Sequence, residues 1–289
     1  MKRLLIVGCG DVARRTIPLL ARRYRVYALL RNTACGADLR AFGVMPLRGD
    51  LDDPDSLSRL AGLADTVLHF APPPSSGTRD TRTRNLLAAL SHGTAPKQLI
   101  YISTSGVYGD CHGAWVDETH LLNAQSERAW RRIDAEKQIR SWATRNRVKV
   151  SILRVPGIYA ADRLPLSRLQ QGTACFTDSE DSYTNHIHAD DLARIIVASL
   201  RHGAACRVYH ASDDSQMKMG EYFDAVADAF GLPLPPRVNR AESQRVLPES
   251  LLSFMNESRR LTNRRMKREL KVKLQYLTVA DWLTTKKHY

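Results

Sequence analysis

Three small residues near the start of the chain have the spacing of a phosphate-binding loop. Gly8, Gly10 and Ala13 form the pattern G-x-G-x-x-A between an apolar run and a helical stretch. The first glycine of such a pattern permits a tight turn, the second lets the backbone approach a pyrophosphate, and the third small residue lets the helix pack on the strand. The helix start offers free N–H groups to the phosphates, so Asp11 and Val12 are expected to border the ligand. The sequence therefore predicts a dinucleotide site, the alternative being a glycine turn that serves packing alone.

The end of the second apolar run bears on the choice between NAD and NADP. Proteins that bind NAD usually place Asp or Glu there, about 20 residues after the glycines, to accept a hydrogen bond from the ribose 2′-hydroxyl. This chain has Leu29-Leu30-Arg31-Asn32 and no acid. Arg31 could pair with a 2′-phosphate, with Asn32 beside it and Arg14 as a second cation. The pattern favours NADP, with NAD still possible, and the alternative is that Arg31 is a solvated loop residue.

The elements that must position these residues alternate regularly through the first 155 residues. Apolar runs predict strands, and the stretches between them have helical character. The expected strands are 3–7, 25–30, 44–47, 66–70, 98–103 and 148–153, and the expected helices are about 11–23, 55–63, 78–92 and 126–146. This alternation predicts an α/β Rossmann fold, a doubly wound parallel sheet covered by helices on both faces.

Beyond residue 155 the alternation is less regular. We expect helices near 190–201 and 219–230, a strand near 207–210 and a proline-rich connector at 231–238. The predicted organisation is an NAD(P)-binding Rossmann domain at 1–155 and a smaller C-terminal substrate lobe at 156–289, interwoven with the first.

Composition narrows the class of protein. The 289 residues are 43% hydrophobic and 25% charged, which is typical of a globular domain and excludes collagen, low-complexity disorder and a coiled coil. No apolar run approaches the roughly 20 residues that a membrane span needs, and the apolar start is too short for a secretory signal. The five cysteines are odd in number and form no C-x-x-C pair, so we expect neither disulfides nor zinc, and a cytoplasmic protein.

The net charge of +13 is concentrated in one segment. Eight of the fifteen residues from 259 to 273 are Lys or Arg, opposed by Glu269 alone. Apolar residues at 261, 266, 270 and 274 predict an amphipathic helix with a basic outer face. That face is either solvated or attracts phosphates of a small ligand or a nucleic acid. Nucleic-acid binding is the less favoured interpretation, because no zinc finger, RNP motif or repeat accompanies the segment.

Several further segments, in this order, resemble one family. They are Gly49-Asp50-Leu51, His69-Phe70-Ala71, the run from Ser103 to Asp110 (STSGVYGD), Asp117-Glu118, the run from Leu153 to Tyr159 (LRVPGIY) and the run from His186 to Ala193 (HIHADDLA). The chain resembles the extended short-chain dehydrogenase/reductase family, of the NAD-dependent epimerase/dehydratase type. The resemblance implies that Thr104 hydrogen-bonds a substrate oxygen. It also implies that Asp50 and Leu51 flank the adenine, Phe70 and Ala71 lie near the riboses, and Pro156, Gly157 and Ile158 lie near the nicotinamide.

The family's acid/base pair, a Tyr four residues before a Lys, is missing. The family commonly has a Glu four residues after that Lys, and Glu136 in this role puts Arg128 and Arg132 at the pair's positions. The register that uses Lys137 instead puts Ile133 at the position of the Tyr. Arg is a poor acid at neutral pH, but Arg132 could hold a ribose hydroxyl or a phosphate.

Two functions remain open from the sequence. One is an oxidoreductase or epimerase acting on a small molecule, in which Tyr108 or Tyr159 could supply the missing proton, although a packing or loop-anchoring role is the favoured interpretation of Tyr108. The other is a catalytically silent NADP-binding sensor or interaction protein. The oligomeric state is open between monomer and homodimer.

Three other groups invite a chemical role. His186 and His188 have the residue types of a metal site, but the N-terminal end of a helix is the favoured interpretation, so no metal is expected. Asp117-Glu118 could form an acid/base pair. Cys9 is either a thiol activated by the helix start or a small filler, which is the commoner case.

Overall fold

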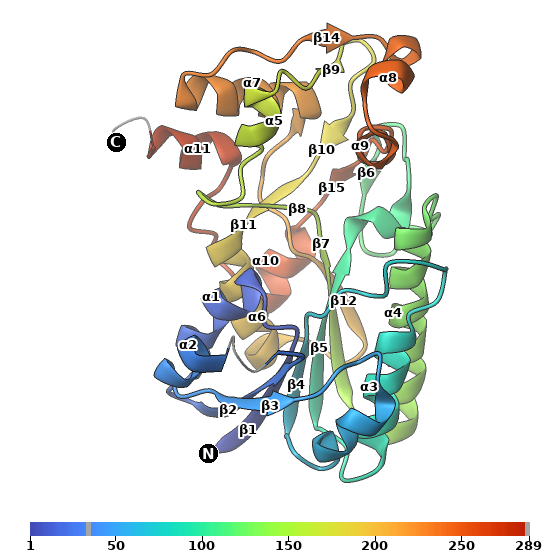
Figure 1. The fold of residues 1–289 in the computed structure, drawn as a ribbon, viewed down its shortest axis with the longest axis vertical. Coiled ribbons are helices and arrows are strands. Elements are labelled where there is room, and N and C mark those ends of the chain that lie inside the picture. The colour runs from blue at the N-terminus through green and yellow to red at the C-terminus, as the bar shows by residue number, and fades with distance from the viewer. Residues whose placement is uncertain (33–35, 287–289) are drawn as a thin grey trace.

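Seven parallel strands form the central sheet in the order β12-β7-β5-β4-β1-β2-β3 (Figure 1). The structure is a computed structural model that describes residues 1–32 and 36–286. The strands are β1 (Lys2–Val7), β2 (Tyr24–Leu30), β3 (Met45–Arg48), β4 (Thr66–His69), β5 (Gln98–Thr104), β7 (Lys149–Val155) and β12 (Arg207–His210). Every predicted strand is present, and the α/β Rossmann fold expected from the sequence is confirmed.

Helices cover both faces of this sheet, as the alternation of strands and helices requires. Helices α1 (Asp11–Leu20), α2 (Gly36–Ala41), α6 (Ala189–His202) and α10 (Arg264–Leu270) lie on one face, and α3 (Thr81–Ser91) and α4 (Glu127–Asn146) on the other (Figure 1). The stretch expected to be helical at 55–63 is the 3₁₀ helix η2 (Pro54–Leu60). Among the residues described, no helix is both long enough and apolar enough to cross a membrane.

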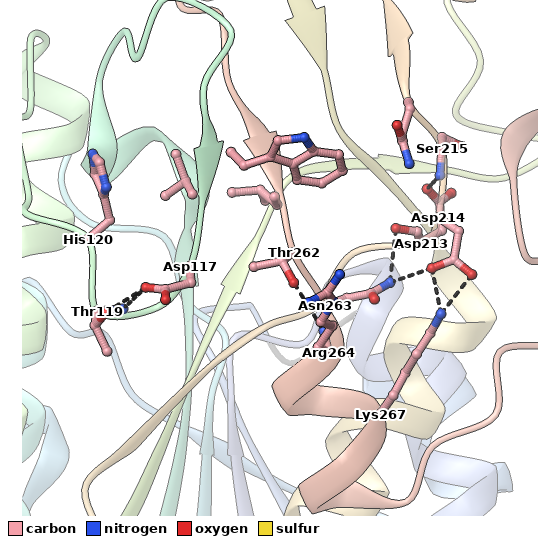
Figure 2. Close-up of a pocket in the computed structure, with 14 residues that line it drawn as sticks. Asp117, Thr119, His120, Asp213, Asp214, Ser215, Thr262, Asn263, Arg264 and Lys267 are labelled. Atoms are coloured by element: carbon pink, nitrogen blue, oxygen red, sulfur yellow. Dashed lines mark hydrogen bonds and ion pairs between the residues drawn. The ribbon is translucent and has the colours of Figure 1, made fainter.

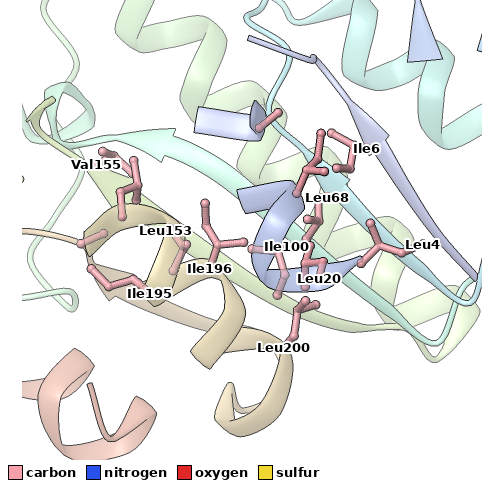
Figure 3. Packing of buried hydrophobic residues seen from close by; sticks show 14 of the residues in the cluster. Leu4, Ile6, Leu20, Leu68, Ile100, Leu153, Val155, Ile195, Ile196 and Leu200 are labelled. Atoms are coloured by element: carbon pink, nitrogen blue, oxygen red, sulfur yellow. The ribbon is translucent and has the colours of Figure 1, made fainter. Parts of the chain in front are cut away.

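Alternate side chains of each strand pack into two separate apolar cores. In β1, Leu4 and Ile6 pack with α1 and α6, whereas Leu5 and Val7 pack with α3 and α4. Figure 3 shows the first core, where side chains of four strands meet Leu20 of α1 and Leu200 of α6. Burial of each such side chain stabilises the fold by about 1.5–3 kcal/mol, which fixes the strand ends that carry the site.

A third core belongs to the part of the chain that follows β7. It gathers apolar side chains from α5 (Leu166–Gln170), α7 (Met219–Phe230), α9 (Glu249–Met255) and α11 (Val279–Thr284), which lie together at one end of the molecule (Figure 1).

The 3₁₀ helix η3 (Ser105–Tyr108) follows β5, and α8 (Arg240–Val246) precedes α9. The short strands are β6 (Trp115–Val116), β8 (Gly157–Tyr159), β9 (Cys175–Phe176), β10 (Tyr183–Thr184), β11 (His186–His188), β13 (Met217–Lys218), β14 (Arg237–Val238) and β15 (Arg260–Leu261). Strand β12 and helix α6 return to the Rossmann sheet, and the division of the chain at residue 155 stays a prediction.

The basic segment 259–273 is not the single amphipathic helix that its spacing predicts. Its first part is β15, which pairs with β6, and only Arg264–Leu270 is helical. Three of its cations point inward to acids: Arg259 to Glu257 at 2.9 Å, Arg265 to Glu118 at 3.4 Å and Lys267 to Asp214 at 2.5 Å. The apolar residues face cores as expected. Arg264, Arg268, Lys271 and Lys273 are exposed, so part of the predicted basic outer face is present, and tertiary ion pairs engage the other three cations.

Candidate functional site

The glycine loop joins the end of β1 to α1 and closes tightly on the end of β4. Gly8 has φ +96°, and a Cβ there would lie 2.4 Å from the backbone nitrogen of Ala71, so only glycine fits. The N–H groups of Phe70 and Ala71 both donate to the Val7 carbonyl, which holds the two loops together. Gly10 is the N-cap of α1, and a Cβ at this residue would meet nothing within 4 Å. The space above Gly10 and the N–H groups at the helix start therefore suit an approaching pyrophosphate.

The first turn of α1 carries the other two residues predicted beside the phosphates. The Asp11 carboxylate receives Arg15 at 2.8 Å and Arg163 at 3.1 Å, so it is held toward the loop after β8. Val12 packs against the first apolar core. These contacts fix the helix start without covering Gly10.

A cavity of about 340 Å³ continues from the glycine loop along the ends of β1, β2 and β3. Six residues predicted to bind the cofactor line it together: Gly8, Arg31, Asn32, Asp50, Leu51 and Ala71. The cavity lies beside the point where the strand order reverses, between β1 and β4, which is where open α/β sheets bind ligands. Phe70 does not line it; its side chain packs against the first core.

The charged residues that line this cavity are Arg31, Arg82 and Asp50, and the sequence analysis missed Arg82. Arg31 is exposed and forms no hydrogen bond or ion pair with another residue in the described part of the chain. Arg82, on α3, also lines the cavity and donates to Asp52 at 2.6 Å, a hydrogen bond that lowers the pKa of that carboxyl. No sequence motif points to Arg82, because only the packing of α3 in the folded sheet brings this residue to the cavity. Arg14, expected as a second cation, pairs instead with Asp38 at 3.5 Å on the surface.

A second cavity, of about 600 Å³, lies at the ends of β5 and β7. Thr104 is opposite Val155 in the paired strands, so the loops that follow both strands meet here. Thr104, Pro156, Gly157 and Ile158 line this cleft together, and the roles that the resemblance implies for them stay predictions. The Thr104 Oγ1 accepts the Gly106 N–H at 3.2 Å, which leaves its hydroxyl proton available to another acceptor.

The cleft also contains groups that the sequence analysis did not assign to it. Tyr183, His186 and Tyr222 come from the second part of the chain, and Glu257 and Arg259 from the loop after α9. His186 is buried with its ring 4.3 Å from that of Tyr222, and burial lowers its pKa to about 3. It is therefore neutral at physiological pH.

Helix α4 fixes which residues occupy the positions of the missing Tyr and Lys. Glu136 and Arg154 form a buried ion pair at 2.7 Å, which sets the register of the helix against β7. Arg128 then reaches the cleft, while Arg132 donates to the Tyr101 hydroxyl at 3.0 Å and to the Ile102 carbonyl at 2.9 Å. Arg132 lines neither cavity. In the alternative register, Ile133 is buried and Lys137 is exposed, so that pair does not reach the cleft.

Neither tyrosine considered as a replacement acid reaches the cleft, so both proposals need correction. Tyr108 is buried, with its hydroxyl 2.6 Å from Nε2 of His210 and 2.7 Å from Arg154. Burial raises the pKa of Tyr108 to about 12. Tyr159 is buried against His188, and burial raises its pKa as well. Tyr108 lies on the inner side of η3, whereas Thr104 at the start of that turn faces the cavity.

The remaining candidate groups have structural partners. His188 Nδ1 accepts the Asp190 N–H and caps α6, and the described residues include no group of three or more potential metal ligands. Asp117 accepts from Thr119, and Glu118 accepts the backbone N–H of His210, away from the cleft. Burial raises the pKa of Cys9 to about 12, which fits a filler and not an activated thiol.

The hollow in Figure 2, of about 840 Å³, lies between the loop after β6 and helix α10. Its lining includes Asp117, Asn263 and Lys267. Lys267 of α10 points to Asp214 on the same side of the hollow, and Asn263 donates to the same carboxylate. Because the charges of Lys267 and Asp214 neutralise one another, the hollow is not lined by charges of a single sign that would attract a ligand.

The comparisons with known proteins agree with this geometry. The model of the NAD(P)H-binding family matches residues 8–203. A functionally unknown conserved protein from Silicibacter pomeroyi is 27% identical with a TM-score of 0.80, covering 100% of this chain and 99% of that one. A dTDP-glucose 4,6-dehydratase from Streptomyces venezuelae with NAD bound is 22% identical with a TM-score of 0.79, covering 99% and 96%. A UDP-glucuronic acid 4-epimerase from Bacillus cereus in complex with NAD is 18% identical with a TM-score of 0.77, covering 99% and 96%. No curated protein matches the sequence.

Proposed function

Because the chain belongs to the NAD(P)H-binding family, we propose that it is an NADP-dependent oxidoreductase or epimerase that acts on a small molecule in the Thr104 cleft. Its fold is that of extended short-chain dehydrogenase/reductases of the epimerase/dehydratase type, as the motifs predicted. In this proposal residues 1–155 bind the cofactor and 156–289 shape the substrate side. The cysteine pattern supports a reducing, cytoplasmic compartment.

One observation carries the proposal: both cavities open at the carboxyl edge of the same sheet. The glycine loop and the Arg31 cavity fit the phosphates and adenosine of a dinucleotide, and Pro156 to Ile158 line the cleft where its other end would lie. The bound cofactor would supply the hydride chemistry. Within the cleft, the Thr104 hydroxyl would donate a hydrogen bond to a substrate oxygen.

The preference for NADP rests on the charge around the adenosine cavity. Arg31 has no ion pair within the described chain, and Arg82 lies in the same lining. A doubly charged 2′-phosphate would give Arg31 a counter-charge and several acceptor oxygens, whereas a ribose 2′-hydroxyl offers one neutral acceptor.

The test is a fluorescence titration with NADPH and NADH. We expect NADPH to bind at least about tenfold more tightly, from one charge-assisted contact. Arg31→Asp should reduce or reverse this ratio, whereas Arg14→Asp, which changes a surface arginine outside the cavity, should leave it unchanged. Equal affinities for the two cofactors would refute the NADP preference, and binding of neither would refute the function.

The second candidate function is a catalytically silent NADP-binding protein. The observation that favours it is the pair Arg128 and Arg132 at the positions of the family's Tyr and Lys, together with the burial of Tyr108. A positioned acid typically contributes 10²–10⁴-fold to carbonyl reduction, so its loss should slow turnover by that range. Tight NADPH binding without turnover on any substrate that occupies the cleft would favour the silent protein.

A further inference from the structure

Arg128 is a guanidinium without a polar partner in the substrate cleft. It lies in the first turns of α4 and lines the cavity with Thr104 and Gly106. Its charged end is 3.7 Å from the centroid of the Phe254 ring. No hydrogen bond or ion pair joins Arg128 to any other residue that the structure describes. Five N–H donors are therefore held at the cleft with only an aromatic face beneath them.

The charge around Arg128 is positive and only partly balanced. Burial lowers the pKa of Arg128. The Glu257 carboxylate opposes this shift, and the neighbouring cations Arg131, Arg259 and Arg132 lower the pKa further. Glu257 is the acid of this cleft, and its carboxylate is already paired with Arg259 at 2.9 Å. One carboxylate thus faces several cations, and an additional anion would be attracted to the cleft.

The position of Arg128 is preorganised for a ligand. Stacking on Phe254 keeps the plane of the guanidinium in place, so that little side-chain freedom is lost on binding. Nearly all buried donors in proteins have hydrogen-bond partners. Arg128 itself is half-buried, whereas the Nε of Arg259, which lines the same cleft, is fully buried and has no hydrogen-bond partner. Such a group of unsatisfied donors is typical of a site that an oxyanion completes.

We propose that Arg128 binds an oxyanion, a carboxylate or a phosphate, of the substrate that enters the Thr104 cleft. This inference rests on the proposed function and adds the substrate class: a small anionic molecule whose charged group lies in the same cleft as the oxygen bound by Thr104. Arg128 then serves as a specificity-determining residue at the position where the family has a proton donor. The planar fork of Arg matches two oxygens of either anion.

The experiment measures the binding of simple anions to the protein saturated with NADPH, so that the cofactor's own phosphate sites are filled. Malonate and inorganic phosphate are titrated separately at constant ionic strength, by ligand-observed NMR. Wild type is compared with Arg128→Ala, Arg128→Lys and the matched control Arg145→Ala, an exposed arginine at the other end of α4. Melting temperature and NADPH affinity are measured for every variant to verify the fold.

We expect at least one of the two anions to bind wild type and the Arg145→Ala variant equally. Arg128→Ala should weaken that binding at least tenfold, and Arg128→Lys should weaken it less, because the charge remains and the fork is lost. The anion that binds more tightly shows whether the charged group of the substrate is a carboxylate or a phosphate. Binding of neither anion, or equal binding by the Arg128→Ala variant, with NADPH affinity intact, overturns this inference and leaves the proposed function standing. Failure of NADPH itself to bind overturns the proposed function instead.

Discussion

The ion pair between Glu136 and Arg154 should contribute more to stability than any exposed pair of the molecule. The carboxylate receives Arg154 at 2.7 Å and 3.1 Å, and both side chains are at most 4% exposed. Glu136→Gln would leave a buried guanidinium without its counter-charge, and breaking such a pair costs about 3–5 kcal/mol. For a chain of this size, that corresponds to a fall in melting temperature of roughly 6–10 °C. Ser103, which donates to Glu136 at 2.6 Å, would lose its charged acceptor next to Thr104.

Urea unfolding of wild type and variants measures this cost directly. The control is Asp38→Asn, which removes the pair with Arg14, half or more exposed on both sides, and should cost less than about 1 kcal/mol. The double variant Glu136→Leu with Arg154→Met should be more stable than Glu136→Leu alone, because no unpaired charge remains. If Glu136→Gln costs no more than the control, the buried pair does not hold α4 against β7, and the reasoning is refuted.

Four further outcomes are expected. Gly10→Ala should weaken NADPH binding and leave the melting temperature unchanged, because the added Cβ meets no protein atom. Gly8→Ala should lower both the NADPH affinity and the melting temperature, because its Cβ would lie 2.4 Å from a backbone nitrogen. Equal melting temperatures for the two variants would contradict this expectation. Burial raises the pKa of Asp213 to about 7, so the folded state keeps a proton that the unfolded state loses near pH 4, and the free energy of unfolding should fall as pH rises between those values. Asp213→Asn should flatten that dependence in urea titrations, and an unchanged profile would exclude Asp213 as its source. Any carbonyl reduction should be slow, and Thr104→Ala should reduce kcat about 10²-fold with NADPH affinity unchanged. Fast turnover that this substitution does not change would place the active site elsewhere. Binding of duplex or single-stranded nucleic acid by the segment 259–273, measured by fluorescence anisotropy, should be weak and should vanish with modest salt. Sequence-selective binding at physiological salt would contradict this expectation.

The sequence by itself determined the fold and the phosphate loop. Strands and helices followed from apolar periodicity, because each element must bury one face, or both, against the next. The glycines at 8 and 10 were readable because a positive φ and an open approach are local requirements that only a few residue types meet. Much of the lining of the cavity beside the glycine loop was predictable, because residues such as Arg31 and Asp50 directly follow strand ends, and parallel strands bring those ends to one edge.

Only the tertiary structure decided which groups face the cleft. Tyr108 looked available, but its hydroxyl meets His210, 102 residues further along the chain, and is buried. The sequence puts Arg128 at the position of the family's Tyr, and the Glu136–Arg154 pair sets α4 so that Arg128 lines the Thr104 cleft. Arg82 reaches the cavity beside the glycine loop through the packing of α3, which no local sequence pattern encodes.

The same distinction explains the basic segment. Its charge count was correct, but Lys267 pairs with Asp214, 53 residues earlier in the chain. Periodicity reports which residues are apolar along one element, and it does not report which distant acid will meet a given cation. Charge pairing and solvent access depend on contacts between elements that are far apart in sequence, so they are decided only when the chain has folded.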